Sequence, residues 1–371
     1  MRLASFNLES LFDRAKALNL ETWSQGKAIL DAYGRLNKLL AKSAYGPADK
    51  TKILEGLDHL GVLKKDDAGP FVLLRQNRGK LLKRPKSGPV EVVASGREDW
   101  IGWLELKTEP VDEIATRNTA QVIREVGADV LGVVEVDNRI ALKRFNDQLL
   151  PAVNGHPYDH VMVIDGNDDR GIDVGLMTRG AFAIVGMRSH VDDMKNGTLV
   201  FSRDCPEYEI ELPAGGRLLV LANHFKSKGF GTPAESSLKR RRQAETVREI
   251  YEARRQAGVT RIAVIGDLND TPGSEPLQSL LGPGSGLRDV SQHPSFQDDG
   301  RPGTFGNGTK SEKFDYILLS PALFDAVGAA GVFRKGVWGG KNGTLWPIYD
   351  EMTAPVQAAS DHAAIWADLN V

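Results

Sequence analysis

Short apolar runs rich in β-branched residues alternate with polar turns along most of the chain, and several of these runs stop on a polar residue. The first run, residues 2–7, predicts a β-strand. From residue 111 onward the pattern is regular, with an amphipathic helix expected over 116–126 and a strand over 130–134. Further strands are predicted at 160–164, 172–177, 182–187, 218–222, 261–265, 316–319 and 363–369, and a long basic helix at about 236–256. Strands mixed with a few long helices predict an α/β or α+β fold of layered architecture.

Residues 13–112 follow a different pattern from the rest of the chain. Leu and Ile spaced among Lys, Ala and Glu over about 24–60 predict two helices, and apolar pieces at 71–74, 90–93 and 100–104 predict short strands. A basic stretch between the first two of these pieces predicts a hairpin tip. We therefore expect a main domain of residues 1–12 and 113–371, and an inserted helical and β-hairpin segment, 13–112, of unknown role.

The composition narrows the function classes only slightly. The chain has 371 residues, of which 41% are apolar and 26% charged, as in ordinary soluble globular proteins. Cys205 is the only cysteine, which excludes an internal disulfide and argues against a cysteine metal site. The net charge of −2 means that nucleic acid could be attracted only by local basic patches. The sequence has no secretory signal pattern and no run long enough for a membrane span, so we expect a cytoplasmic protein with no membrane partner.

Polar residues that suit catalysis fall at the ends of the predicted strands. Side chains at strand ends are held rigidly by the sheet and still reach solvent. If these ends share one rim of a sheet pair, they form a single acidic pocket with two imidazoles. Each residue alone could cap a turn or fill the core, but that explanation is poor for all of them at once. The residues are Asn7, Glu135, Asn223, His224, Asp267, Asn269, Asp315, Asp361 and His362.

This set of residue types suits the hydrolysis of a phosphodiester by water. Charge builds on the phosphoryl and leaving oxygens, and a divalent cation held by carboxylate oxygens neutralises it. Mg²⁺ accepts few protein ligands and keeps several waters. Glu135, Asn7 and Asp361 are therefore the expected metal ligands.

The remaining residues have natural parts in proton transfer. His362, with an ordinary pKa of about 6.5, suits moving protons at neutral pH, and Asp315 would fix its tautomer. Asp267 would orient or deprotonate the water. Asn269 would donate a hydrogen bond to the phosphoryl oxygen, and His224 would do the same or protonate the leaving oxygen.

As an ordered set, the motifs at these positions resemble the endonuclease/exonuclease/phosphatase superfamily, which has the DNase I-like fold. The motifs are Phe6-Asn7, Val134-Glu135, Asn223-His224, Gly266-Asp267-Leu268-Asn269, Phe314-Asp315-Tyr316 and Ser360-Asp361-His362. The resemblance implies a four-layer sandwich of two packed mixed β-sheets flanked by helices. It also implies a hydrolase that cleaves phosphoesters with Mg²⁺ or Mn²⁺. The large α+β insertion after the first strand departs from the family pattern.

Two segments, 170–176 and 224–228, are similar to those of the bacterial extracellular-nuclease branch. By this resemblance Arg170 would contact phosphate and Asp173 would steady His224. We also expect Asn223 and Lys226 to bind substrate. The missing export signal departs from that branch, so its extracellular role does not transfer.

Three basic features favour nucleic acid as the substrate. Residues 75–86 carry six cations and no acid, although a solvated hairpin tip would look the same. Residues 239–242 open a helix, where we favour a solvated face. In the loop 334–347, Trp338 and Lys341 would stack a base and hold a phosphate, unless the loop is a packed tryptophan corner.

We therefore expect a nuclease, and more specifically an endonuclease, that acts on DNA or RNA. One alternative is a phosphatase or phosphodiesterase for a small or lipid-linked phosphoester. Another is a non-catalytic nucleic-acid-binding member of the same fold. A zinc hydrolase is disfavoured because no two histidines show tight ligand spacing.

Overall fold

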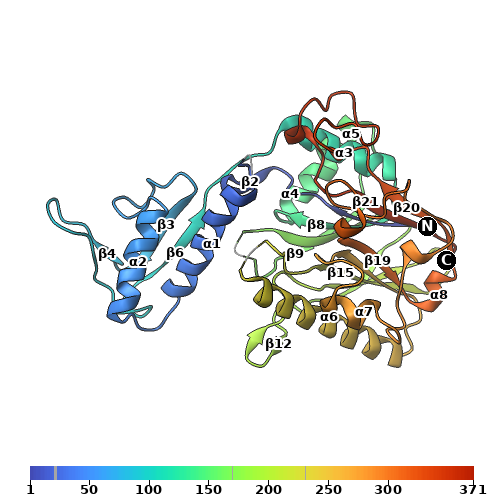
Figure 1. The fold of residues 1–371 in the computed structure, drawn as a ribbon. Helices are drawn as coiled ribbons and strands as arrows, with labels where there is room; N and C mark the ends of the chain where they lie inside the picture. Colours follow the sequence, from blue (N-terminus) through green and yellow to red (C-terminus); the bar gives the residue numbers. More distant parts are fainter. Residues whose placement is uncertain (21–22, 169, 230) are drawn as a thin grey trace. The chain divides into compact units, whose positions relative to one another are not determined.

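The computed structural model describes residues 1–20, 23–168, 170–229 and 231–371, which form two compact units (Figure 1). The first unit comprises Met1–Phe12, Val111–Lys228 and Thr232–Val371, and the second comprises Asp13–Pro110 and Gly229–Gly231. That the second unit is a separate inserted domain remains a prediction. Among the described residues, no helix is both long enough and apolar enough to cross a membrane.

The first unit is built on two mixed β-sheets. The seven-stranded sheet has the order β18 (Phe296–Gln297), β20 (Val327–Phe333), β21 (Ala364–Leu369), β1 (Arg2–Asn7), β8 (Val130–Val136), β10 (Asp173–Thr178) and β9 (His160–Ile164). The six-stranded sheet has the order β11 (Ile184–Arg188), β14 (Glu207–Glu211), β15 (Arg217–His224), β16 (Ile262–Asp267), β19 (Asp315–Leu319) and β17 (Arg288–Asp289). A small hairpin pairs β12 (Met194–Lys195) with β13 (Thr198–Leu199). Neighbouring strands are often far apart in sequence, so each sheet gathers distant segments.

Local sequence signals bound the two long helices of this unit. Helix α3 (Glu113–Val126) is capped by Asp112, whose side chain accepts from two backbone N–H groups, and it ends at Gly127 in the left-handed region. Helix α6 (Pro233–Gln256) starts with a capping box between Thr232 and Glu235. The short helices are α4 (Arg139–Arg144), α5 (Leu150–Ala152), α7 (Gln278–Leu281) and α8 (Pro321–Phe324), a π-helical turn at Phe145–Leu149, and 3₁₀ turns at Glu275–Leu277, Val290–Gln292, Lys310–Glu312 and Pro355–Gln357.

Alternation along the strands creates four layers. On β8, Val130 and Val134 pack between the sheets while Leu131 and Val133 pack with α3; on β15, residues 218, 220 and 222 face the other sheet while 219 and 221 pack with α6. The sheets approach so closely that a Cβ on Gly132 would lie 2.4 Å from Cδ1 of Ile265. The predicted sandwich of two packed sheets flanked by helices is confirmed.

The second unit has its own apolar core. It contains the 3₁₀ turn Lys16–Leu18, helices α1 (Trp23–Leu40) and α2 (Pro47–His59), and three two-stranded ladders: β2 (Asp13–Ala15) with β7 (Thr108–Pro110), β3 (Val72–Arg78) with β6 (Ile101–Leu106), and β4 (Leu82–Lys83) with β5 (Glu91–Val92). Leu36 and Leu57 from the two helices pack with Trp100 and Leu104. The two helices expected over 24–60 are present, and the turn between β4 and β5 is the expected hairpin tip.

Candidate active site

The functional side chains of the six-stranded sheet lie together because of strand direction. Strands β15 and β16 run parallel and end at His224 and Asp267, which are direct register partners. Strand β19 runs antiparallel to β16, so its first residue, Asp315, is also a register partner of Asp267. These three polar residues are thus placed at one edge of the sheet, although His224 and Asp315 lie 91 positions apart in the sequence.

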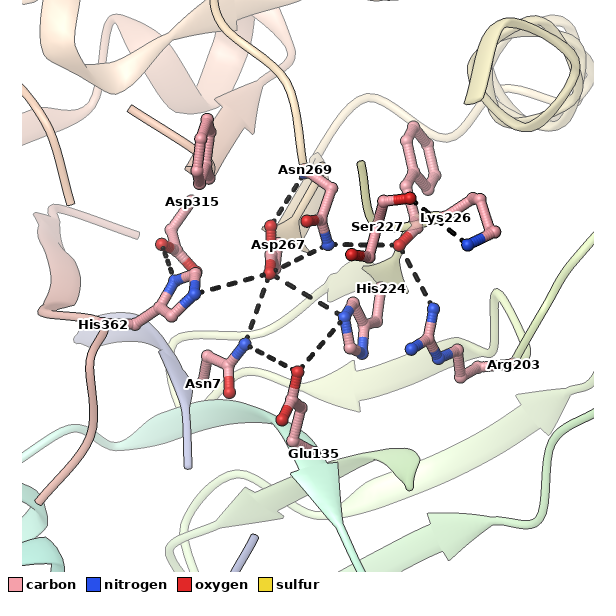
Figure 2. A network of polar contacts seen from close by, with 12 residues as sticks. Asn7, Glu135, Arg203, His224, Lys226, Ser227, Asp267, Asn269, Asp315 and His362 are labelled. Carbon is pink, nitrogen blue, oxygen red and sulfur yellow. Dashed lines mark hydrogen bonds and ion pairs between the residues drawn. The ribbon is translucent and has the colours of Figure 1, made fainter. Parts of the chain in front are cut away.

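The Asp267 carboxylate is the centre of the cluster (Figure 2). Its Oδ2 lies 3.8 Å from Nε2 of His224, 3.9 Å from Nε2 of His362 and 3.3 Å from Nδ2 of Asn7. Oε1 of Glu135 lies 3.4 Å from the same Asn7 nitrogen and 3.5 Å from Nε2 of His224. The ends of strands from both sheets therefore bring two carboxylates and two imidazoles to one point.

Unusual backbone geometry aims two of these strand ends. Glu135 has φ 62°, and it is skipped in the β8–β10 register, in which Val134 and Val136 have partners. This β-bulge turns the Glu135 side chain out of the normal alternation. Gly266 has φ 125°, and a Cβ there would lie 1.9 Å from the carbonyl oxygen of Asn223, so only glycine fits.

His362 forms a dyad with Asp315. Its Nδ1 lies 2.7 Å from Oδ2 of Asp315, which also accepts a 2.7 Å hydrogen bond from Oγ1 of Thr304. Burial by itself lowers the pKa of His362, but the carboxylates of Asp315 and Asp267 outweigh it and raise the pKa well above its usual value. The imidazole is therefore charged at neutral pH, with Nε2 on the side of Asp267.

His224 is biased in the opposite direction. Burial lowers its pKa well below the usual value, and the cations Arg203 and Arg170 add to this effect. Its Nδ1 is buried and has no hydrogen-bond partner among the described residues, while its Nε2 faces Glu135 and Asp267. Neighbouring groups whose pKa values are pushed apart are suited to separate acid and base roles.

Asp267 itself is tuned toward neutrality. Burial raises the pKa of Asp267 to about 7, with His362 opposing the rise and Asp315 adding to it. Asn269 orients this carboxylate: its backbone N–H donates to Oδ1 at 2.7 Å and its Nδ2 to Oδ2 at 3.1 Å. Nδ2 also donates to the carbonyl of Phe225 at 3.2 Å, so both amide hydrogens are used. Direct donation from Asn269 to a phosphoryl oxygen would require one of these bonds to break.

Oxygen ligands suitable for a divalent cation are concentrated in this cluster. Ligand atoms of Asp267, Asp315 and His362 all lie within 4.8 Å of one another. Oδ1 of Asp315 is buried and, in the part of the chain that is described, has no hydrogen-bond partner. Carboxylate-rich sites suit Mg²⁺ or Mn²⁺, so the residues present fit such an ion.

The three predicted metal ligands lie around this group with different orientations. Glu135 directs its carboxylate into the cluster, and Asp361 has Oδ1 3.8 Å from Nε2 of His362. Asn7 places its amide nitrogen toward the carboxylates, while its Oδ1 accepts a 3.0 Å hydrogen bond from the backbone of Glu9. Ligation by Asn7 would therefore require its amide to turn over. Their roles as ligands remain predictions.

Two positioning residues carry no signal in the sequence. Thr304 lies in a loop and accepts from the backbone N–H of Asp315 at 3.0 Å while donating to its carboxylate. Glu9 accepts a 2.9 Å hydrogen bond from the backbone N–H of Asp361, which ties the segment after β1 to the loop before β21. Both act through partners far away in sequence, so no local pattern indicates them.

A buried guanidinium supports the loop after β15. Arg203 is 1% exposed, donates from Nη1 to the carbonyl of Phe225 at 3.2 Å, and has Nη2 3.0 Å from Asp168. The same carbonyl of Phe225 accepts from Nδ2 of Asn269. Asp168 also holds Arg170 at 2.8 Å. The contact of Arg170 with phosphate therefore remains a prediction.

Two predicted residues are not brought to the cluster. Asn223 is fully buried, and its Nδ2 donates to the carbonyl of Leu221 at 3.1 Å. Strand alternation points it away from the side occupied by His224, so it offers no surface to a substrate. Asp173 accepts a 2.7 Å hydrogen bond from the backbone N–H of Gly166, and no hydrogen bond between Asp173 and His224 exists among the described residues.

Lys226 and the basic run of α6 are involved in structural contacts. Burial, with help from Arg203, lowers the pKa of Lys226 to about 7. Its carbonyl accepts from Arg240 at 3.1 Å, and Arg240 is buried against Asp270 at 2.9 Å. Arg241 forms an ion pair with Glu275, which lies after β16. The run 239–242 therefore anchors the helix and is not simply a solvated face.

The loop 334–347 is a packed tryptophan corner. Trp346 is buried and donates from Nε1 to the carbonyl of Val337 at 2.8 Å. Trp338 packs against the apolar core beside α3, whereas Lys341 is exposed. A stacking role for Trp338 is disfavoured by this packing, and phosphate contact by Lys341 remains a prediction.

Comparisons with known proteins agree with this architecture. Among solved structures the chain is similar to an endonuclease/exonuclease/phosphatase from Bacteroides vulgatus, with a TM-score of 0.50 and 17% identity over 70% of this chain and 91% of that chain. It is also similar to a mannosyl-6-phosphatase from Bacteroides thetaiotaomicron, with a TM-score of 0.51 and 19% identity over 70% and 92%. These likenesses concern the fold alone. No curated protein sequence matches the chain.

A family model gives the more specific result. The model described as "Endonuclease/Exonuclease/phosphatase family" matches residues 84–326, which is more than half of the chain. These matches do not single out the extracellular-nuclease branch. The chain belongs to the endonuclease/exonuclease/phosphatase family of phosphoester hydrolases.

Proposed function

We propose that this chain is a divalent-metal-dependent phosphodiesterase that cleaves nucleic acid. The observation that carries the proposal is the position of Asp267, whose carboxylate lies 3.8 Å from one imidazole and 3.9 Å from the other. One of these imidazoles is charged and the other neutral. The Asp267 carboxylate can receive a proton from water, and the two imidazoles can supply protons or hydrogen bonds to a phosphoryl group. The similarity of residues 170–176 and 224–228 to the extracellular-nuclease branch favours a polynucleotide.

Five residues of the cluster have a defined part in this proposal. Asp267 orients the attacking water and accepts its proton. His362, charged and fixed by Asp315, donates a hydrogen bond to a phosphoryl oxygen. His224, neutral, donates a hydrogen bond from Nε2 to the leaving oxygen, which takes its proton from solvent. Asn269 keeps the Asp267 carboxylate in position.

The acidity of the site explains why a cation is required. A phosphodiester is an anion and is repelled by a cluster of carboxylates at short range. A divalent ion would be held by Glu135 and its neighbouring carboxylates, and when bound it would neutralise charge on the phosphoryl oxygens. The oxygen-rich ligand set favours Mg²⁺ or Mn²⁺ over zinc.

The test is a substrate panel with the purified full chain in chelator, Mg²⁺ and Mn²⁺. The substrates are supercoiled plasmid, single-stranded DNA, RNA, a bis-aryl phosphodiester, inositol phosphates and a sugar phosphate. Asp267→Asn serves as the inactive variant, and Asp325→Asn, a change of the same chemistry at an exposed position, is the matched control.

The panel separates the proposal from its competitors. Metal-dependent cleavage of polynucleotides that is lost in Asp267→Asn and kept in Asp325→Asn supports a nuclease. Faster release of inorganic phosphate from the monoesters would instead identify a phosphatase. Absence of any hydrolysis under all conditions would leave only a non-catalytic binding role.

A further inference from the structure

Charge is distributed unequally between the inserted segment and the rest of the chain. Residues 13–110 contain 18 Lys and Arg against 13 Asp and Glu, whereas the remaining residues contain 29 against 36. The small negative charge of the whole chain therefore conceals a basic segment and an acidic one. A basic segment on an acidic hydrolase indicates a separate affinity for an anionic partner.

The positive charge of the segment is concentrated in one acid-free stretch. No Asp or Glu occurs from residue 68 to residue 90, and six cations lie within 75–86. Two of these cations are neutralised, because Arg75 pairs with Glu105 at 2.7 Å and Arg84 pairs with Asp66 at 2.7 Å. The other four are exposed and form no ion pair with any described residue.

Arg84 joins two further cations to this group. Its guanidinium donates to the carbonyls of Leu63 and Val62 at 2.7 and 3.1 Å, which fastens the β4 strand to the loop before β3. This loop carries two exposed lysines, and its own acids are neutralised by Arg84 and by Lys107. We call the exposed cations the basic patch: Lys64, Lys65, Arg78, Lys80, Lys83 and Lys86.

An exposed tryptophan lies on the sheet face next to the basic patch. In the β3–β6 ladder, Leu74 and Leu104 point into the apolar core, so Trp103 points outward and is 41% exposed. Its register partner is Arg75. Ile101, two residues away on the same face, is the partner of Arg78, so the tryptophan and the basic patch are continuous.

We infer that this surface of the second unit binds single-stranded nucleic acid. The basic patch would contact successive phosphates, and Trp103 would stack on an unpaired base. The inference extends the proposed function, because it names the form of the polynucleotide that a nuclease of this kind would hold. A flat aromatic ring beside unpaired cations matches a chain of phosphates with exposed bases better than it matches a duplex, whose bases are already stacked.

Binding is measured with the full chain in the presence of chelator, so that no hydrolysis occurs. The probe is a fluorescent oligothymidylate of about 16 nucleotides, followed by anisotropy across a salt series. The patch variant is Arg78→Gln/Lys80→Gln/Lys83→Gln. The matched control, Arg35→Gln/Lys38→Gln/Lys52→Gln, removes the same charge from exposed positions on α1 and α2.

The patch variant should flatten the salt dependence of binding. Each phosphate contact contributes about 0.7 to the slope of log affinity against log salt for single strands, so losing three contacts lowers the slope by about 2. The charge-matched control should leave the slope near that of the unaltered chain. Equal losses in both variants would show that only net charge matters and would overturn the inference.

Stacking is tested with Trp103. Trp103→Ala should weaken binding roughly tenfold, while Trp103→Phe should retain most of the affinity. An oligonucleotide of abasic sites should bind the unaltered chain about as weakly as oligothymidylate binds Trp103→Ala. No change in Trp103→Ala, or tighter binding of a duplex of the same length, would also overturn the inference.

These outcomes are independent of the catalytic proposal. Cleavage of the bis-aryl phosphodiester by the unaltered chain is measured separately with metal. Cleavage without the predicted binding pattern would remove the inference and keep the phosphodiesterase, whereas the binding pattern without cleavage would do the reverse.

Discussion

The two units bury different kinds of side chain. The first unit buries many polar and charged groups, including Asp267 and Asp315 of the site and the Arg240–Asp270 pair. In the second unit, none of the described residues between 13 and 110 buries a charged or polar side chain apart from aromatic hydroxyl and indole groups, such as Tyr45 and Trp100, which bond to each other. The first unit therefore buries groups that can take part in chemistry, whereas the second unit buries side chains that serve to pack its core.

Physical cost explains why this difference is informative. Removing a charge from water is unfavourable unless partners compensate, so a fold retains buried charges where they do something. A unit whose buried side chains are aliphatic or aromatic is stabilised directly by its core, and its function must come from its surface. Catalysis is therefore expected in the first unit, and binding at the exposed side chains of the second.

The largest expected effect is at the buried carboxylate of the site. Asp267→Asn keeps the shape of the side chain but cannot accept a proton, so turnover of a phosphodiester should fall by at least a hundredfold. The fold should remain intact, as measured by circular dichroism. Full activity in this variant would show that the buried Asp267 carboxylate is not needed for catalysis, and the distinction drawn between the two units would be lost.

The same variant has a pH-dependent stability. The pKa of Asp267 is raised from 3.8 to about 7 in the folded protein, so the charged form opposes folding. In chelator, the stability of Asp267→Asn relative to the unaltered chain should therefore rise as pH increases from about 4 to 7 and then level off. A fall over this range, measured by thermal unfolding at each pH, would contradict the buried-charge interpretation.

The next effect is expected in the core of the second unit. Leu57 is fully buried there, so Leu57→Ala should destabilise the unit by about 3 kcal/mol. Hydrolysis of the bis-aryl phosphodiester should not change, because Leu57 belongs to the core of the second unit and contributes no group to the active-site cluster. Denaturant unfolding measures the first quantity, and Leu238→Ala, at an exposed position of α6, is the control. Activity that declines in step with stability would break the comparison.

A smaller effect should show that not every buried charge of the first unit is catalytic. His190 lies 2.7 Å from Asp193 and 2.9 Å from Glu207. Burial lowers its pKa, but these carboxylates outweigh burial and raise it. The charged imidazole therefore stabilises the fold below about pH 6.5, and this contribution is lost as pH rises through the raised pKa.

His190→Gln should accordingly cost about 2 kcal/mol at pH 6 and less at pH 9, without loss of turnover. Thermal unfolding at the two pH values measures the difference, and the exposed His59→Gln is the control. An equal cost at both pH values would show that packing, not charge, explains the role of His190.

The smallest effect concerns metal affinity. Asn7 donates to Glu135 and Asp267, so Asn7→Ala should weaken Mn²⁺ binding about tenfold by leaving the carboxylates less well oriented. Glu135→Gln should weaken it further, and Asn370→Ala should not weaken it. Titration calorimetry provides the readout independently of activity. Unchanged Mn²⁺ affinity in both Asn7→Ala and Glu135→Gln would indicate that the cation binds on the Asp315 side of the cluster.

Strong alternation made much of the fold predictable. Strand β1 has the bounds expected from residues 2–7, and α3 begins three residues before the expected start. Strand β20 was not expected, because the run Val327–Phe333 contains two glycines and two alanines and has little strand character of its own. It is held by its pairing with β21. Tertiary pairing supplied what local preference lacked.

The site was predictable where polar residues end apolar runs, and it was not where contacts join distant segments. His224, Asp267 and His362 were indicated by their strands, whereas Thr304 and Arg203 lie in loops with no pattern of their own. Asn223 is not brought to the cluster, because β15 continues to residue 224, two positions beyond the expected end, and the continued alternation turns Asn223 away.

The short ladder between β2 and β7 has a consequence for the folding pathway. Parallel pairing of β1 with β8 has to close a loop that contains residues 13–110, and loop closure becomes less favourable as the loop lengthens. Asp13 is the register partner of Pro110, and the backbone N–H of Val111 donates to the carbonyl of Phe12 at 2.8 Å. Once this ladder forms, the chain leaves and returns at nearly one point. The conformational entropy that is then lost when β1 pairs with β8 is little more than the entropy lost in closing a hairpin turn, although the loop contains nearly one hundred residues.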